Sequence, residues 1–464
     1  MVYRPTAHEF DDLPKIEFID SCPYQVFLEQ YLKPCVPVLI GPKLTAQWKA
    51  NTTWITSKGD PNILHSYILP DKPCTSRDNT SGNSLLNDND IKNFIRSYAE
   101  RIVNNEDKNV FLDSLLLSPN YEYLEENYGT IPVPLAYCNE KDRYGSQRRE
   151  TVPLKSALHE LRDEQVQLQC RQAPSNQALK SLYAKDMHLF RHLDPADFPY
   201  STPDIFADDW LNAYVIDCES DDFRFAYLGS HLTTTGLHTD VYASHSFSVN
   251  LCGVKCWLFI DPKDLQTIAS LYDDQQLPSW ITKDDLFRGP LVNHRHLIKI
   301  LFQYPGQTVF VPSGWYHQVL NIGTTLSINH NWCNASCILQ MYTALKEQYE
   351  VSAESLKDLL EDGIVTKDRF SQVVTEVVEA NYGWCWRRFW GMIKHQLKRR
   401  DAILHSSEYF SKWPIQPEFL PPLSWEYSIL KNILLNDEPG STFDSGSPPS
   451  SIVTIFKSLG DFKE

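Results

Sequence analysis

Between residues 131 and 331 the chain is a succession of short β-strand signals, and this pattern restricts the fold more than any other feature. Alternating or apolar runs at 131–137, 223–227, 246–252, 256–260, 308–311 and 324–331 are separated by Gly, Pro and polar residues. Many short strands with such punctuation are typical of an all-β barrel or a jelly roll. Within the series, Gly253-Val254-Lys255 predicts a hairpin turn between the strands 246–252 and 256–260.

Helical patterns flank this β region. A helix is expected to start after Pro23 and to end near Pro34, followed by a buried strand at 36–40. The polar stretch 71–92 reads as a surface insertion, and a short helix is expected at 91–103. Beyond Asn334 the apolar residues recur at helical spacing, so these helices are expected to pack on the barrel or on a second copy of the chain.

The chain therefore divides into three expected parts. Residues 1–125 form an N-terminal α/β extension, residues 126–336 a β core, and residues 337–464 a helical region with a flexible loop at 436–450. The predicted class is mainly β with helices.

Charge and cysteine content narrow the choice of partners and compartment. The net charge of −16 over 464 residues argues against nucleic acid as a direct partner and suits a basic protein substrate. The polar N-terminus lacks the apolar core of a secretory signal, and no apolar run approaches the length of a membrane span. Eleven scattered cysteines suit a reducing compartment, so a cytoplasmic or nuclear location is expected.

Two histidines and one aspartate in the β region have the residue types of an iron centre. His238 and Asp240 stand two positions apart, so on one strand both side chains project to the same face. His317 follows the strand signal 308–311 and is expected on a neighbouring strand. Two imidazoles and one carboxylate form the facial triad of non-haem Fe(II) oxygenases, which leaves coordination positions open. The pattern predicts that the chain binds Fe(II) and activates O2.

The motifs around these residues resemble the jumonji (JmjC) family, and within it the hydroxylase subgroup. The resemblance covers about residues 180–335 and rests on LYAKD at 182–186, DDWLN at 208–212, FRF at 223–225, TTTGLHTD at 233–240, GVKCWLF at 253–259 and SINHNW at 327–332. It implies a double-stranded β-helix of the cupin type and dependence on Fe(II) and 2-oxoglutarate. It also implies a protein substrate, namely a lysyl side chain of a translation termination factor.

The family pattern also assigns residues to 2-oxoglutarate. Lys255 matches the lysine that pairs with its distal carboxylate, which is costly to bury unpaired. Tyr183 and Thr235 match residues that donate to the same carboxylate, and Asn331 matches a polar residue near the cosubstrate.

One position departs from this pattern. Related hydroxylases carry an Asn ten residues after the first ligand, where this chain has Ser248. Asn250 shares its strand face and is the alternative source of the amide.

The substrate side of the site leaves several alternatives open. Asp209, Asp217 and Asp222 are candidates to meet a lysine ammonium at the pocket mouth. The competing functions are an N-methyl-lysine demethylase of the histone type, a non-catalytic cupin binding module, and a zinc hydrolase or isomerase on the same barrel. The remaining histidines are expected in structural roles, and Cys252, Cys256, Cys333 and Cys337 as small buried side chains.

Overall fold

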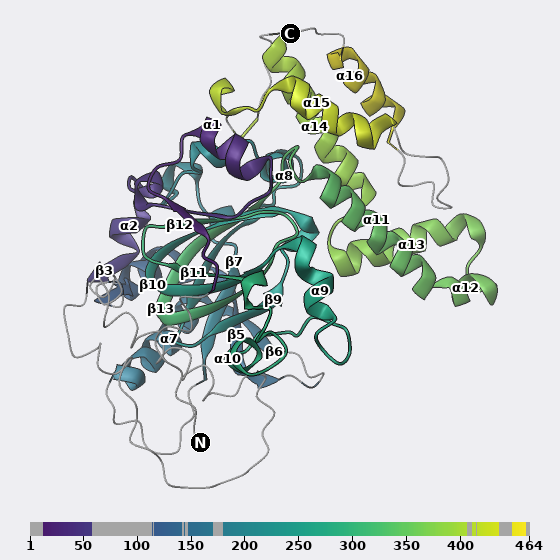
Figure 1. Ribbon diagram of the computed structural model, residues 1–464. Coiled ribbons are helices and arrows are strands. Elements are labelled where there is room, and N and C mark those ends of the chain that lie inside the picture. The colour runs from purple at the N-terminus through teal and green to yellow at the C-terminus, as the bar shows by residue number, and fades with distance from the viewer. Residues whose placement is uncertain are drawn as a thin grey trace.

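The computed structural model describes residues 13–57, 114, 116–141, 143, 147–169, 180–405, 411–413, 415–435 and 448–460. The expected insertion at 71–92 and the expected helix at 91–103 lie outside these residues, as does most of the expected loop at 436–450. Figure 1 shows a β-rich body with the C-terminal helices stacked beside it.

Two long antiparallel strands, β10 and β13, organise the β-rich body. They pair along their whole length, from His245 opposite Trp332 to Ile260 opposite Tyr316. In one half they are flanked by β12 and β8, and in the other by β11 and β9. The strands are β8 (Arg224–Gly229), β9 (Thr234–His238), β10 (His245–Ile260), β11 (Ile298–Gln303), β12 (Thr308–Val311) and β13 (Tyr316–Trp332). Two four-stranded sheets that share two bent strands make a double-stranded β-helix, as expected.

The expected hairpin at 253–255 is wrong, because β10 continues without reversal through this segment. Gly253 has a φ of 67°, and the register with β13 shifts on both sides of Cys252. A bulge of this kind bends a strand and leaves its direction unchanged. The Asn250 amide donates to the carbonyl oxygen of Gly253 at 2.8 Å inside the bend. The bend carries β10 from the first sheet into the second and places Lys255 opposite Asn321.

The first sheet extends on both sides of this core. Its strand order is β1-β2-β12-β10-β13-β8-β7-β5-β6, and a separate pair is formed by β3 and β4. The additional strands are β1 (Glu17–Ile19), β2 (Val38–Ile40), β3 (Ile55–Ser57), β4 (Leu117–Pro119), β5 (Pro132–Lys141), β6 (Gln147–Pro153) and β7 (Leu182–Met187).

The N-terminal segment is part of the barrel. The expected helix is present as α1 (Tyr24–Phe27), which continues as the π-helical turn η1 (Leu28–Leu32). Phe27 lies against Phe310 of β12, with ring centroids 5.0 Å apart, and β2 pairs with β12. The further helices before the C-terminal region are α2 (Ala50–Thr53), α6 (Tyr121–Tyr128), α7 (Leu154–Gln169), α8 (Trp210–Cys218), α9 (Leu265–Ala269) and α10 (Lys283–Phe287).

The C-terminal region is helical, as expected, and packs on the barrel. A shared apolar core joins Trp210 of α8 and Phe225 of β8 to Met341 and Phe389 of the C-terminal helices. These helices are α11 (Ile338–Ser355), α12 (Lys357–Glu361), α13 (Lys367–Tyr382), α14 (Trp386–Leu404), α15 (Leu423–Leu435) and α16 (Ser450–Gly460). None of the helices in the described part of the chain is long and apolar enough to cross a membrane.

Candidate active site

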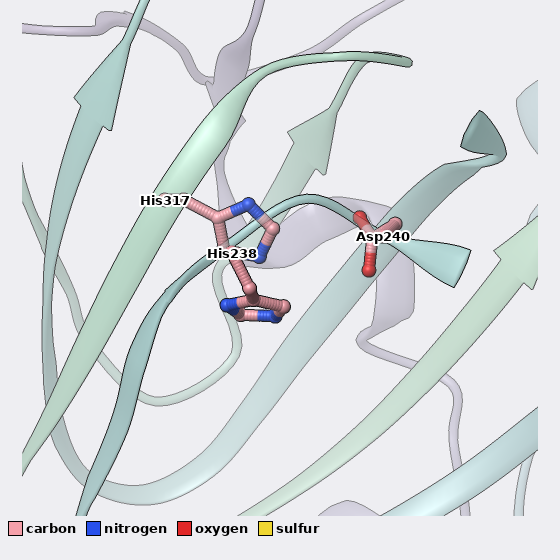
Figure 2. A group of neighbouring side chains, drawn as sticks. All are labelled: His238, Asp240 and His317. Atoms are coloured by element: carbon pink, nitrogen blue, oxygen red, sulfur yellow. The ribbon is translucent and has the colours of Figure 1, made fainter. Parts of the chain in front are cut away.

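The fold brings His238, Asp240 and His317 together. His238 ends β9 and lies directly opposite His317 near the start of β13, with ring centroids 4.3 Å apart. Asp240 lies just past the strand, at the start of the 3₁₀ turn η6 (Val241–Ala243), rather than on the strand as expected. One potential ligand atom from each residue lies within 4.8 Å of the others, and Figure 2 shows the two rings side by side with the carboxylate beyond them.

Neighbouring groups fix the orientation of all three side chains. The Nδ1 of His238 donates to the Gly236 carbonyl oxygen at 2.8 Å, and the Nδ1 of His317 donates to that of Trp315 at 3.1 Å. Each Nε2 is thereby left as a lone-pair donor for a metal. The carboxylate of Asp240 accepts from Ser246 Oγ at 2.7 Å and from Asn331 Nδ2 at 3.0 Å.

The surroundings keep His317 neutral at physiological pH. Its ring packs against Trp257 and Phe259, with centroid separations of 5.6 and 5.8 Å. Burial lowers the pKa of His317 to about 4, with a further lowering from His238. A neutral imidazole is the form that binds a metal.

Lys255 is a buried cation among neutral partners. Its side chain is 2% exposed, and Nζ donates to Asn321 Oδ1 at 3.0 Å and to the Tyr183 hydroxyl at 3.5 Å. Burial lowers the pKa of Lys255 to about 7. A buried ammonium without a carboxylate beside it is costly, and a ligand carboxylate would offset that cost.

Tyr183 contacts Lys255, and Thr235 contacts Tyr183. Burial raises the pKa of the Tyr183 hydroxyl, and hydrogen bonds with Asn321 and Thr235 offset part of the rise. Asn321 also donates to Thr233 Oγ1 at 2.9 Å. The sequence analysis missed Asn321, although an amide within the apolar run 319–322 is the kind of buried polar group that calls for an explanation.

The other three assignments to 2-oxoglutarate find different partners. Asn331 holds Asp240, and Ser248 Oγ donates to Asn329 Oδ1 at 3.2 Å. The Asn250 amide donates to the backbone carbonyl oxygens of Gly253 and Gln303 at the bend of β10. Ser246, which the sequence analysis also missed, is the second support of Asp240. None of these contacts supports a cosubstrate role for Ser248 or Asn250.

A cavity of about 610 Å³ opens beside the triad. Its walls are aromatic and charged, and they include His238, Asp240, Thr235, Phe225, Tyr227, Asp186, Asp222 and Arg149. Of the three acidic candidates for a substrate ammonium, only Asp222 lines it. Asp209 caps α8, and Asp217 accepts from His395 at 2.9 Å.

The C-terminal region supplies one wall of this cavity through Gly383 and Arg388. Tyr242, two residues after Asp240, has a φ of 58° and stacks on Trp384 at 5.2 Å. The Tyr382 ring contacts the Tyr242 ring, with centroids 5.3 Å apart. The turn that follows Asp240 is therefore held by the helices.

A second group of possible metal ligands, His188, Asp221 and Asp222, borders the cavity. The Arg191 guanidinium lies among them and forms ion pairs with both aspartates. Asp222 also pairs with Arg224 at 2.9 Å. The arginines balance these carboxylates, so the group forms an ion-pair network.

Four of the cysteines and His245 have surroundings that fit structural roles. Cys252, Cys256, Cys333 and Cys337 are buried and free. His245 accepts from the Ser313 backbone N–H at 2.8 Å.

Comparison with known proteins adds the family. A family model described as JmjC domain, hydroxylase, matches residues 225–332, which contain β10, β13 and the whole triad. Residues 225–332 therefore match a JmjC domain. A domain described as a hydroxylase favours an oxygenase over the binding module and the zinc hydrolase.

Relatives extend the similarity beyond this domain. The 2-oxoglutarate and iron-dependent oxygenase JMJD4 of Mus musculus is 33% identical over 252 residues, which is 53% of this chain and 57% of the mouse protein. JMJD4 of Danio rerio is 27% identical over 395 residues, 84% of this chain and 77% of the fish protein. The bifunctional arginine demethylase and lysyl-hydroxylase psr-1 of Caenorhabditis elegans is 29% identical over 142 residues, 29% of this chain and 35% of the worm protein.

The alignment thus spans little more than half of the mouse relative. The triad offers the nitrogen and oxygen donors that ferrous iron prefers, and Lys255 offers a buried charge opposite in sign to 2-oxoglutarate. Both groups fit the residues present.

Proposed function

We propose that this protein uses iron and 2-oxoglutarate to hydroxylate a lysyl side chain of another protein. The observation that carries this proposal is Lys255, a buried ammonium held by a tyrosine and an asparagine within the barrel that holds the triad. A dead cupin would have no physical reason to keep both costly features. The name of the worm relative includes lysyl-hydroxylase, which supports lysine as the target.

The roles of the residues follow from their surroundings. His238, Asp240 and His317 would hold the metal, while Ser246 and Asn331 would keep the Asp240 carboxylate in place. Lys255 would pair with the distal carboxylate of 2-oxoglutarate, and Tyr183, Thr235 and Asn321 would complete its hydrogen bonds. When bound, ferrous iron and 2-oxoglutarate would activate O2, the oxidant that supplies the oxygen atom inserted into a C–H bond.

The substrate we propose is a lysine of a translation termination factor. This choice is supported by the family resemblance alone. That assignment carries with it a cytoplasmic location, with the nucleus as a second one. The division at residues 125 and 336 and a homodimer through the C-terminal helices are proposals as well.

Demethylation is the second candidate function. The worm relative is named for both activities, and both need the same metal and cosubstrate. A hydroxylated N-methyl group releases formaldehyde, whereas a hydroxylated side-chain carbon keeps the added oxygen.

The test uses purified protein with Fe(II), 2-oxoglutarate and the termination factor. We expect succinate formation and a one-oxygen mass increment on a lysine of the factor, both absent in Asp240→Ala. Succinate with formaldehyde and no mass increment would select demethylation. An unmodified factor despite succinate formation would overturn the proposed substrate.

A further inference from the structure

Asp186 occupies an irregular position in β7 that turns it into the cavity. The register between β7 and β8 shifts between Ala184 and Met187, and Asp186 lies within the shift with a φ of 53°. Bulges next to active sites re-aim a side chain, and a left-handed non-glycine residue costs free energy. The result is that Asp186 lines the same cavity as His238 and Asp240.

Asp186 has a weaker cationic partner than the neighbouring carboxylates. Asp222 pairs closely with Arg224, and Asp221 pairs closely with Arg191. Among the described residues, Asp186 forms an ion pair with the half-exposed Arg149, whose Nη1 lies 4.0 Å from Asp186 Oδ2. The neighbouring Lys185 instead directs its ammonium to the Thr234 carbonyl oxygen at 3.2 Å.

A tyrosine links Asp186 to the triad. The Tyr227 hydroxyl donates to Asp186 Oδ1 at 2.5 Å. Burial raises the pKa of Tyr227, and the negative charges of Asp186 and Asp240 raise it further. Tyr227 and Phe225, with ring centroids 6.3 Å apart, form an aromatic part of the cavity wall that Asp186 and Asp240 also line. Such a wall suits an alkyl stem that ends in a cation.

We propose that Asp186 receives the ammonium of the substrate lysine, while the methylene stem of that lysine lies along Phe225 and Tyr227. The inference rests on the proposed lysyl hydroxylation and names the residue that selects lysine. The hydrogen bond from Tyr227 already occupies one side of the carboxylate. A compact ammonium therefore fits better than a guanidinium, which needs both oxygens in a planar fork.

The test compares two degenerate nonapeptide libraries that differ only at the central residue, lysine in one and the neutral norleucine in the other. Hydroxylation by the iron-loaded protein is measured by mass spectrometry at several peptide concentrations. We expect the wild type to prefer the lysine library by about 10- to 100-fold in kcat/KM, the range for a hydrogen bond to a charged group. Asp186→Asn should bring the two libraries within about threefold, mainly by raising KM for the lysine peptides.

Matched variants separate this role from damage to the fold. Asparagine tolerates a left-handed backbone, so Asp186→Asn keeps the local geometry. Asp221→Asn removes another carboxylate from the same cavity and should keep the preference for lysine. If Asp186→Asn keeps that preference, the inference is overturned while the proposed function stands. If the wild type modifies no central lysine, the proposed function fails and the inference fails with it.

Discussion

Lys255 shows how a single residue carries a functional signal when its surroundings are known. Apart from the family resemblance, the sequence shows only a lysine two residues after a glycine, a position that also suits a solvated turn. In the structure it is 2% exposed, and Tyr183 and Asn321 hold its ammonium. The Lys255 ammonium is kept away from water, and a dianionic ligand would offset the free-energy cost of burying it.

Lys255→Ala should raise the 2-oxoglutarate concentration needed for half-maximal succinate formation by about 10- to 100-fold, because a charged hydrogen bond is lost. Lys185→Ala is the matched control. It removes another buried lysine, whose ammonium lies 4.9 Å from the Tyr183 ring. Equal effects of the two variants would contradict the assignment of Lys255.

The low pKa of Lys255 predicts a pH dependence of cosubstrate binding. Burial lowers that pKa from 10.5 to about 7, so above pH 7 the free protein carries a growing fraction of neutral amine. A ligand carboxylate favours the ammonium, so binding should take up a proton and the affinity should fall above pH 7. Calorimetry with N-oxalylglycine in buffers of different ionisation enthalpy measures the uptake. Proton release, or no proton exchange at pH 8, would count against it.

The supports of Asp240 should matter for metal affinity. Ser246→Ala or Asn331→Ala should weaken Co(II) binding by about 10- to 100-fold, because a carboxylate that loses its partner loses its orientation. Ser248→Ala serves as the control, since Ser248 donates to Asn329 instead. Titration of the metal into each variant gives the comparison. Equal losses in Ser246→Ala and Ser248→Ala would argue against this role.

At the scale of elements, the bend of β10 is what the sequence could not disclose. Glycine beside a break in an alternating pattern occurs in turns and in bulges alike, and only the pairing of Lys255 with both Asn321 and Gln303 separates the two. The strand signals at 308–311 and 324–331 are confirmed, the first as a short apolar run and the second as an alternating pattern. The triad was predictable because its residue types and the order of the surrounding motifs resemble the family pattern. Asn321 and Asp186 were not, because their roles depend on cross-strand partners.

Gly253→Ala should destabilise the barrel by more than the strain of a left-handed alanine alone, about 1–3 kcal/mol. A Cβ at this position would lie 2.5 Å from the Thr324 carbonyl oxygen. Gly363→Ala is a matched control, since Gly363 has a φ of 70° and nothing within 4 Å of the added Cβ. Urea unfolding compares the two free energies. Equal losses would show that the close approach in β10 carries no cost.

At the scale of the whole molecule, the barrel and the C-terminal helices share one core. Trp210, Phe225, Met341 and Phe389 belong to the same apolar cluster, although they come from elements on both sides of residue 336. Near residue 336 the chain changes from β-strand to helix, and the apolar cluster contains residues from both sides of that point.

A chain ending at residue 336 should therefore lose cooperative unfolding and expose apolar surface, which is measurable by thermal denaturation and by dye binding. Removal of the terminal helix α16 alone, by ending the chain at residue 447, is the milder comparison. A sharp, native-like transition in the shorter chain would show that the barrel folds without the helices.

The stacking of Tyr242 on Trp384 couples chemistry to a distant part of the chain. Trp384 and Tyr382, which lie outside the barrel and are not among the proposed metal ligands, hold the turn that follows Asp240. Loosening of α13 and α14, by warmth or by a change in their packing, would release that brace while the β-strands stay paired. Oxygenation would then fade in a protein whose barrel is still folded.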